Sequence, residues 1–437
     1  MRAASTVWIR AKGLFESNSR NRSMKPLLLA CCAALLPAGP ARAQPYLPPE
    51  AVVREAVQQS PEVQAADAAR RGAQARADGL RVGTHETVVR AIGQRRWVRD
   101  GVHERFVEGQ IAVERPLRLW GKAEADAQLA DATGATGRVA AQDARHEAAR
   151  RLLTLWFAAL RAGQVRQAAQ DNAAAAAELA RITERRVRAG DAARLDAELA
   201  QAEQARMQAA LAAARANEQA ALADLRARFP GLGDSAELPA DLAAPLPESP
   251  TQPPGQLRSH YIEHSHELLL ARADEDLALR LARRTDLERR PDPTVGVFAS
   301  SERGGAERLA GVSLSVPLGS TYRQAQAQAA AADADAALSR RLAAERRLGA
   351  DFDVLWSQLE GRRAAAQAQA AAAALQRSTA ERALRAYRAG ESGLAELLAV
   401  RRSLADALLA ERLARSEALE SDSRLRLDLH RLWDFDE

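Results

Sequence analysis

Two short segments, 200 positions apart, place a glycine inside a long alanine-rich helical pattern. The first is VRAGDAARLDAELA, Val187–Ala200, and the second is YRAGESGLAEL, Tyr387–Leu397. Glycine is disfavoured inside helices but is common where a helix ends in the left-handed conformation. We therefore predict that Gly190 and Gly390 each mark a tight turn between two long helices.

The two glycines belong to a duplication of the whole chain. Trp156 matches Trp356, Pro116 matches Pro317, and SPEV from Ser60 matches SHEL from Ser265, all at offsets of 200 to 205. Self-similarity over this length predicts two copies of one structural unit. We expect a first repeat at 44–229, a proline-rich linker at 230–256 and a second repeat at 257–437.

Periodicity divides each repeat in the same way. We expect short helical segments at 48–80 and 257–290, each followed by a β-hairpin whose second strand alternates apolar and polar residues, as in RFVEGQIAVERP from Arg105. A long helix follows, from Lys122 to Ala189 or from Tyr322 to Ala389, with a return helix at 192–228 or 392–432. Each long helix has 68 residues and would span about 100 Å.

The N-terminus has the features of an exported protein. MKPLLLACCAALLPAGPARAQ, from Met24, has a basic start, an apolar run and an A-x-A site, which predicts a signal peptide cleaved between Ala43 and Gln44 after an N-terminal extension. Residues 1–43 hold seven of the 62 Lys/Arg and one of the 57 Asp/Glu, which leaves 55 positive and 56 negative charges. The mature chain is thus nearly neutral, which argues against a nucleic-acid partner. Both cysteines precede Ala43, which excludes disulfides and cysteine metal sites from the mature chain.

Four strands and two very long helical hairpins do not form an ordinary globular domain. Strands in a membrane must close into a barrel because every edge N–H group needs a partner, and four strands are too few. Three chains would supply twelve strands, and the alanine-rich helices would pack closely into a hollow tube. The sequence therefore predicts a mainly α fold with a small β part that requires assembly of several chains, and three copies could enclose a volume.

With these features, the chain resembles the TolC-type outer-membrane efflux channels over residues 44–432. The resemblance rests on the paired VRAG and YRAG segments, on ERPLRLWGK (Glu114–Lys122) and SVPLG (Ser315–Gly319), and on the export signal. It implies a trimer with a 12-stranded transmembrane β-barrel in the outer membrane and an α-helical tunnel in the periplasm. It also implies a periplasmic membrane-fusion adaptor, an inner-membrane RND-type pump and lipid as partners. No cofactor is expected.

The resemblance also assigns roles to residues near the two glycines. The adaptor-docking tips correspond to Val187, Arg188, Ala189, Gly190 and Asp191 in the first repeat, and to Arg388, Ala389, Gly390 and Glu391 in the second. Its periplasmic gate corresponds to Tyr387 and Asp196, with Glu396 at the equivalent place in the second repeat. The family's arginine two positions after the second glycine is Ser392 here, so the gate latch differs. Asp196 and Glu396 are also consistent with ordinary charges on a solvated helix face.

ERPLRLWGKAEA, from Glu114, resembles the heavy-metal branch of this family, whose pumps export cobalt, zinc, cadmium, copper or silver. A second metal hypothesis is the pair His260 and His264 in HYIEHSH, which share a helix face with Glu263 nearby. The matching region around Ser60 has no histidine, which favours a solvated helix start instead.

Two other classes of protein are compatible with parts of this sequence. A periplasmic coiled-coil adaptor would share the export signal and a long hairpin, but it would need β-domains flanking one hairpin. An exported helical enzyme would need a catalytic cluster. The chain has no glycine-rich phosphate loop and no Ser/His/Asp constellation, so we expect a channel and not an enzyme.

Overall fold

The structure of this protein is a computed structural model, which describes residues 45–99, 101, 104–235, 244–433 and 435. The predicted extension and signal peptide at 1–43, and the cleavage site between Ala43 and Gln44, lie outside the described residues. All described residues belong to one unit by their internal contacts, Gln44–Glu437. This unit contains both sequence repeats.

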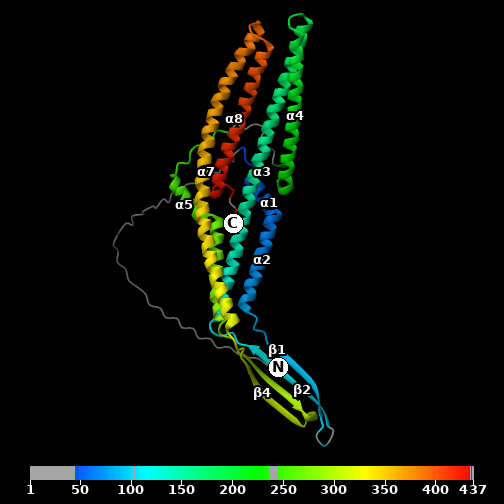
Figure 1. Cartoon of the computed structure of the whole chain (residues 1–437), viewed down its shortest axis with the longest axis vertical. Coiled ribbons are helices and arrows are strands. Elements are labelled where there is room, and N and C mark those ends of the chain that lie inside the picture. Colours follow the sequence, from blue (N-terminus) through cyan, green and yellow to red (C-terminus); the bar gives the residue numbers. More distant parts are fainter. Residues whose placement is uncertain (1–44, 100, 102–103, 236–243, 434, 436–437) are drawn as a thin grey trace, which may run out of the picture. The chain divides into compact units, whose positions relative to one another are not determined.

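Each repeat contributes two short helices, two strands and two helices that form a hairpin, in that order. The first repeat contains α1 (Glu50–Gln58), α2 (Pro61–Val82), β1 (Val88–Val98), β2 (Glu104–Pro116), α3 (Lys122–Arg188) and α4 (Arg194–Arg228). The second contains α5 (Pro254–His264), α6 (His266–Leu287), β3 (Thr294–Glu302), β4 (Glu307–Ser315), α7 (Thr321–Ala389) and α8 (Leu394–Asp428). Two 3₁₀ turns, η1 (Pro230–Ser235) and η2 (Arg303–Gly305), complete the described elements. The predicted fold class, mainly helical with long hairpins and a small antiparallel sheet, is confirmed (Figure 1).

The short helical segments differ from the prediction, because 48–80 and 257–290 each contain two helices. The breaks fall at Ser60 and Ser265, which have extended backbone and form the N-caps of α2 and α6. Pro61 occupies the first position of α2, where its missing N–H is harmless. These sequence signals were sufficient to predict the first break.

The long helices have 67 residues in α3 and 69 in α7, and both return helices have 35. The expected lengths of the long helices are therefore correct to one residue. The second return helix ends at Asp428 and not near 432, because the backbone turns into the left-handed region at His430, where φ is 56°.

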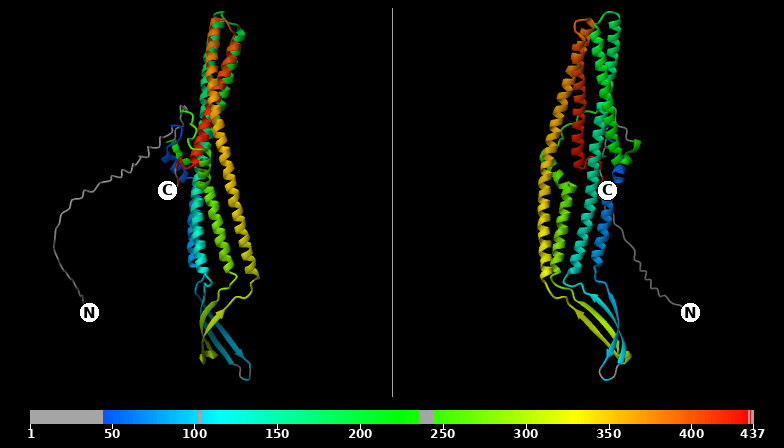
Figure 2. Two further views of the ribbon diagram at one scale, coloured as in Figure 1. Left: turned by 90° about the vertical axis from the view of Figure 1, so that its left-hand side faces the viewer. Right: turned by 45° about the vertical axis from the view of Figure 1, so that its right-hand side comes forward.

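The helices pack as two similar groups. α3 lies along α2 and α4, and α7 lies along α6 and α8, while contacts of α3 with α6 and α8 join the repeats (Figure 2). Most buried side chains of α7 are alanine, which allows the helix axes to approach closely. None of the helices in the described part of the chain is both long and apolar enough to cross a membrane.

Larger side chains are concentrated in three apolar clusters. The first surrounds Trp156, which is 2% exposed and donates its indole N–H to the carbonyl oxygen of Tyr46 at 2.8 Å. The second contains Phe352, against which Trp356 stacks with ring centroids 6.1 Å apart. Both tryptophans are thus packing anchors between helices. The third cluster lies beneath the turns at Gly190 and Gly390.

The four strands form one antiparallel sheet in the order β1-β2-β3-β4. The pairing places Ile111 opposite both Ala91 and Ala299, and Val297 opposite both Val113 and Val312. Residues opposite one another share a face of the sheet. A central band on one face is therefore apolar across all four strands and contains Val89, Ala91, Ile111, Val113, Val295, Val297, Ala299, Ala310, Val312 and Leu314. Arg95, Ser301 and Arg308 lie on the same face, beyond this band.

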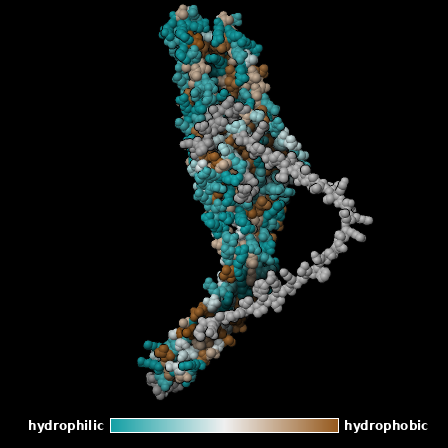
Figure 3. Space-filling model, turned by 180° about the vertical axis from the view of Figure 1, so that it is seen from behind, coloured by the Kyte–Doolittle hydropathy of each residue, from teal (hydrophilic) through white to brown (hydrophobic). Residues whose placement is uncertain are grey.

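The apolar face of the sheet is exposed in this chain. Val312 is 83% exposed, Leu314 70% and Ile111 60%. The other face is mostly polar and includes Arg90, Gln94, Glu108, Gln110, Glu114, Ser300 and Ser313. Figure 3 shows hydrophobic residues at the surface of the sheet, whereas the surface along the helices is largely hydrophilic. Such an apolar patch indicates contact with another molecule or with lipid.

An ionic junction connects the sheet to the helices. Lys122, the only lysine after residue 43, is fully buried, and its ammonium group contacts Asp292 at 2.9 Å, Glu288 at 3.2 Å and the carbonyl oxygen of Arg290 at 2.8 Å. The indole N–H of Trp120 donates to the carbonyl oxygen of Pro291 at 3.2 Å. Trp120 and Lys122, at the end of ERPLRLWGK, therefore bind the first repeat to residues 288–292 of the second.

Candidate functional site

The two helical turns at the glycines have the same hydrogen bonds. At the first, the N–H of Asp191 donates to the carbonyl oxygen of Arg186 at 2.8 Å and that of Gly190 to Val187 at 3.1 Å. At the second, Glu391 donates to Ala386 at 2.9 Å and Gly390 to Tyr387 at 3.2 Å. This pair of bonds is the Schellman motif, which satisfies the last carbonyl groups of a helix.

The Schellman geometry explains both glycines. Their φ angles are +82° at Gly190 and +77° at Gly390, in the region that glycine adopts without steric cost. A Cβ atom at either position would meet nothing within 4 Å, so the backbone conformation, and not the space around it, requires glycine. The predicted tight turns are confirmed.

The predicted tip residues are arranged alike in both repeats. Arg188, Ala189, Gly190 and Asp191 are exposed, as are Arg388, Ala389, Gly390 and Glu391, and Val187 is half-buried. The two turns lie at the same end of the hairpins, opposite the end from which the strands leave (Figure 2). The tips therefore present arginine, glycine and a carboxylate twice on one end of the chain.

The third apolar cluster joins the two hairpins just beneath the tips. It contains Leu179 and Ala180 of α3, Ala200 of α4, Tyr387 of α7, and Leu394, Leu397 and Leu398 of α8. The guanidinium group of Arg186 lies over the ring of Tyr387, 5.1 Å from its centroid, within the range of a cation–π contact. Tyr387 is 7% exposed, so it packs between the hairpins.

The predicted gate residues are not joined to one another by hydrogen bonds in this chain. The hydroxyl group of Tyr387 is buried and has no hydrogen-bond partner among the described residues. Asp196 and Glu396 occupy the same position in the first turns of α4 and α8, where a carboxylate interacts favourably with the helix dipole. Asp196 is half-buried and Glu396 is exposed.

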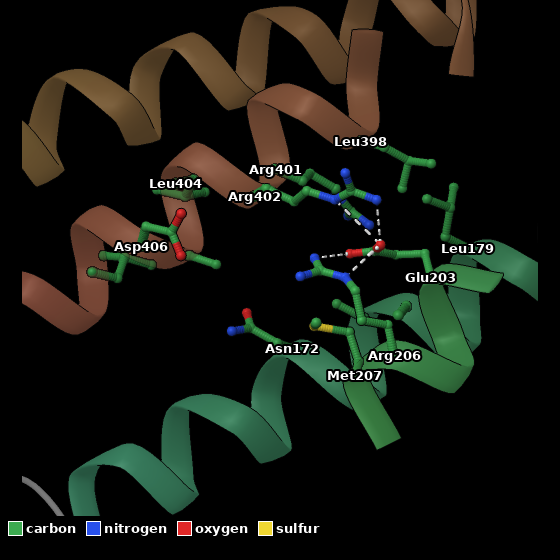
Figure 4. Close-up of a pocket in the computed structure, with 14 residues that line it drawn as sticks. Asn172, Leu179, Glu203, Arg206, Met207, Leu398, Arg401, Arg402, Leu404 and Asp406 are labelled. Atoms are coloured by element: carbon green, nitrogen blue, oxygen red, sulfur yellow. Dashed lines mark hydrogen bonds and ion pairs between the residues drawn. The ribbon is translucent and has the colours of Figure 1, made fainter. Parts of the chain in front are cut away.

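Below this cluster, a cavity of about 300 Å³ lies between α3, α4 and α8 (Figure 4). Its apolar wall includes Leu179, Met207 and Leu398, and its polar lining consists of Asn172, Glu203, Arg206, Arg401, Arg402 and Asp406. Figure 4 shows Glu203 between the guanidinium groups of Arg206 and Arg402.

Glu203 connects the two hairpins electrostatically. Its carboxylate accepts hydrogen bonds from Arg206 of α4 at 2.7 and 3.1 Å, and from Arg402 of α8 at 2.6 and 3.2 Å. Its side chain is 7% exposed. The hydrogen bonds from Arg206, together with those from Arg402, lower the pKa of Glu203 to about 2. We call Glu203, Arg206 and Arg402 the inter-hairpin ion cluster.

A further arginine contributes to the charge of this cavity. Burial, together with the nearby guanidinium group of Arg388 at the tip, lowers the pKa of Arg401. The cavity therefore holds one low-pKa carboxylate, three arginines and Asp406 between the hairpins. This arrangement restrains the helices relative to one another, and it offers no nucleophile with an activating base.

Sequence reasoning missed the inter-hairpin ion cluster. Glu203 and Arg402 are 199 residues apart and lie in helices with many similar Glu/Arg pairs, so no local spacing distinguishes them. Only an alignment of the two repeats indicates the pair, because Glu203 lies 13 positions after Gly190 and Arg402 lies 12 positions after Gly390.

The rings of His260 and His264 lie against each other at an interplanar angle of 34°. The ring centroids of His260 and His264 are 4.1 Å apart, and Nδ1 of His264 contacts the carbonyl oxygen of His260 at 3.1 Å. Burial lowers the pKa of His260, and the neighbouring imidazole of His264 lowers it further. Among the described residues, the histidines that meet as a group of three are instead His146, His266 and His430.

The architecture can be compared with known proteins. No protein-family profile matches the chain, and no curated protein matches it by sequence. Solved structures match nearly all of it. The CmeC outer-membrane channel of Campylobacter jejuni has a TM-score of 0.72 at 14% identity, covering 89% of this chain and 86% of its own. The outer-membrane protein VceC of Vibrio cholerae has a TM-score of 0.71 at 17% identity, and the match covers 88% of this chain and 96% of VceC. The OprN outer-membrane channel has a TM-score of 0.72 at 20% identity, and the match covers 88% of this chain and 90% of OprN.

The chain has the fold of an outer-membrane channel. The resemblance predicted from the VRAG and YRAG segments is thus confirmed at the level of the fold. The TM-scores of these matches are nearly equal, so they do not distinguish the heavy-metal branch from other channels of this fold. The adaptor alternative required one hairpin flanked by β-domains, whereas the described residues form two equal hairpins, each preceded by a strand pair.

Proposed function

We propose that this chain is the outer-membrane channel of a tripartite efflux system in a Gram-negative bacterium, and that it conducts substrates passively without enzymatic activity. The observation that carries the proposal is the exposed apolar face of the four-stranded sheet, at the opposite end of the hairpins from the tips. A sheet that is apolar outside and polar inside is the pattern of a membrane barrel wall.

The dimensions of the sheet support this assignment. On the apolar face, β2 runs from Arg105 to Arg115 with Val107, Ile111 and Val113 between them. Ten steps along a strand measure about 34 Å, and a strand tilted by about 40° would rise about 26 Å. This is close to the apolar band of about 25 Å in outer-membrane barrels, and the two arginines would lie near its borders.

The edges of the sheet support a trimer. Within the described residues, β1 and β4 each pair on one side only, which leaves a row of unpaired N–H and C=O groups. We propose that β4 of one chain pairs with β1 of the next. Three chains would close twelve strands, with the apolar face towards lipid and the polar face, including Gln110 and Glu114, towards the lumen.

The tips are the proposed docking surface for a periplasmic membrane-fusion adaptor, which in turn contacts an inner-membrane RND-type pump. The exposed Arg188 and Asp191 of the first tip and Arg388 and Glu391 of the second offer charged groups on rigid Schellman turns. Rigid turns fix the position of these groups before binding, which reduces the entropy lost on docking.

The periplasmic gate is proposed to involve Asp196, Tyr387 and Glu396. All three lie within six residues of a tip glycine, so movement of the tips on adaptor docking would move them. The carboxylates of Asp196 and Glu396 would then favour passage of cations.

Heavy-metal cations are the proposed cargo, on the basis of the ERPLRLWGK signature alone. Deletion of the gene should increase sensitivity to cobalt, zinc, cadmium, copper or silver salts, and complementation should restore resistance. Unchanged sensitivity to all five, in a strain with no second channel of this fold, would contradict this choice of cargo while leaving the channel assignment intact.

Two isoleucines at the same height in the sheet allow a matched test of the membrane assignment. Ile111 is 60% exposed on the apolar face, and Ile92 is 45% exposed on the polar face. Arginine on the lipid side of a barrel costs about 2–4 kcal/mol near the midplane, repeated three times in a trimer. We expect Ile111→Arg to lose trimer from the outer-membrane fraction and Ile92→Arg to keep it. Equal behaviour of the two variants, or a wild-type chain that fractionates as a soluble monomer, would refute the proposal.

A further inference from the structure

Three imidazole rings from distant parts of the sequence meet where α3 of the first repeat contacts α6 and α8 of the second. His146 lies within α3, His266 is the first residue of α6, and His430 follows the end of α8. Their ring centroids are 4.9 to 5.3 Å apart, and one possible ligand atom from each ring lies within 4.8 Å of the others. We call these residues the histidine triad.

Oxygen acceptors orient two of the three rings. Nε2 of His146 lies 3.2 Å from a carboxylate oxygen of Asp428, and Nε2 of His430 lies 3.1 Å from the carbonyl oxygen of His264. Because neither acceptor carries a proton, both contacts favour the neutral tautomer with its proton on Nε2, in which Nδ1 has its lone pair available to a metal ion. Metal-bound histidines typically donate their second ring nitrogen to a carboxylate or a carbonyl in this way.

The backbone at His430 adds an independent observation. The N–H of His430 donates to the carbonyl oxygen of Leu427 at 3.0 Å and that of Arg431 to Arg426 at 2.8 Å, which is the same Schellman pattern as at the tips. The left-handed position is filled by glycine at both tips but by histidine here, with φ of 56°. A side chain in this conformation is strained relative to glycine, and the turn aims its imidazole at the other two.

The charges around the triad are balanced. Asp428 pairs with Arg150 at 2.6 Å and with Arg424 at 2.8 Å, and Glu147 also pairs with Arg150. The positive charge of Arg150 is therefore shared by two carboxylates. His146 and His266 are 6% and 7% exposed, so their rings are held in place by packing.

We propose that the histidine triad binds one divalent transition-metal ion of the zinc type, with a water molecule as fourth ligand. Imidazole nitrogens are preferred ligands of such ions, at about 2.0–2.1 Å, which places ligand nitrogens roughly 3.4 Å apart in a tetrahedral site. The ligand atoms lie within 4.8 Å of one another, so they need to approach by up to about 1.4 Å, which side-chain rotation supplies.

The metal ion would connect α3 of the first repeat with α6 and the end of α8 in the second. It would be a resident ion that fixes the repeats to each other at this level, and it does not depend on what the channel transports. Both its binding and its stabilising effect can be measured on the purified chain, without a pump or an adaptor.

The decisive variant is His430→Gly, because glycine suits the left-handed turn and removes only the imidazole. Tag-free mature protein in detergent is titrated with Co²⁺, whose visible absorption reports tetrahedral nitrogen coordination, and then with Zn²⁺ as competitor. We expect one Co²⁺ per chain with a Kd of about 1 μM or tighter, displaced by Zn²⁺. His430→Gly should weaken binding by at least about 100-fold, since the loss of even an outer-shell partner costs 10- to 100-fold.

Two controls make the result decisive. The double variant His260→Gln/His264→Gln should bind Co²⁺ as the wild type does, and Zn²⁺ should raise the thermal midpoint of the wild type but not that of His430→Gly. Without metal, His430→Gly should unfold at the wild-type temperature or above, because the turn is relieved of strain. The proposal is overturned if the wild type binds no Co²⁺ at about 1 mM, if His430→Gly binds equally well, or if the His260/His264 variant loses the site.

Discussion

The inter-hairpin ion cluster predicts a measurable restraint on α8. We consider Arg402→Met, which keeps an unbranched side chain and removes the guanidinium group that reaches from α8 to Glu203 on α4. The matched control is Arg206→Met, because Arg206 binds the same carboxylate from within α4. Both variants remove one positive charge, but only Arg402→Met breaks a link between the hairpins.

The magnitude follows from the pKa of Glu203. The ordinary value of 4.5 falls to about 2, and this difference corresponds to about 3 kcal/mol in favour of the ionised form in the folded protein. Arg206 and Arg402 share this interaction and are 52% and 51% exposed, so solvent screens much of it. We therefore expect the loss of Arg402 alone to cost about 1 kcal/mol.

The dependence on pH has a definite sign. Because the folded pKa of Glu203 is lower than the unfolded one, the ion cluster stabilises the folded state above pH 4.5, and this contribution disappears as the pH falls towards 2. The difference in thermal midpoint between wild type and Arg402→Met should therefore be constant from pH 7 to 5 and shrink below pH 4.5. A difference that grows on acidification would contradict the role of Glu203.

Single-channel recording in planar bilayers tests the functional consequence. If the chain is a channel as proposed, and the cluster holds α8 in its closed arrangement, a loss of about 1 kcal/mol raises the ratio of open to closed channels about fivefold. Arg206→Met should remain within about twofold of the wild type. The reasoning is refuted if Arg402→Met does not open the channel, or if Arg206→Met opens it equally, because charge loss and not the link would then be responsible.

Three further predictions follow from the tips, the proposed gate and the ionic junction at Lys122. Gly190→Ala and Gly390→Ala should each cost about 1–2 kcal/mol, because alanine is strained at positive φ; thermal unfolding measures this cost, and adaptor pull-down should weaken in parallel. Replacing Asp196 and Glu396 together by alanine should reduce cation selectivity in bilayers, and unchanged conductance and selectivity would exclude them from the gate. Lys122→Met should cost about 3 kcal/mol, since it leaves buried acceptors without their cation. In the wild type, amine reagents should label this single lysine only after unfolding, so rapid labelling of the native protein would contradict its burial.

Much of the fold was predictable because its determinants are local. Gly190 and Gly390 interrupt continuous helical patterns, and their positive φ angles follow from the requirement of a Schellman turn. Alternation in β2 predicts one apolar and one polar face, and a one-residue shift would exchange them. The break at Ser60 was equally local, since serine followed by proline is a helix-start signal, but the expected single segment overlooked it.

The candidate sites depend on tertiary contacts that no local pattern encodes. The histidine triad combines residues 146, 266 and 430, which no sequence spacing connects. The metal hypothesis drawn from the sequence instead named His260 and His264, because they are four residues apart. Tyr387 was expected at a gate, and packing places it between the hairpins under Arg186.

By itself, the sequence determined the lengths of the two long helices, the turns and the faces of the strands, because each depends on a local pattern of residues. The repeated order of elements was visible because matching residues lie 200 to 205 positions apart. Only the tertiary structure decided which of the many Glu/Arg pairs joins the hairpins and which histidines meet. The physical reason is that long helices with repetitive surfaces can pack in many registers. The actual register is set by a few large side chains, such as Trp156, whose cluster joins the two repeats, and Phe352, whose cluster lies within the second repeat.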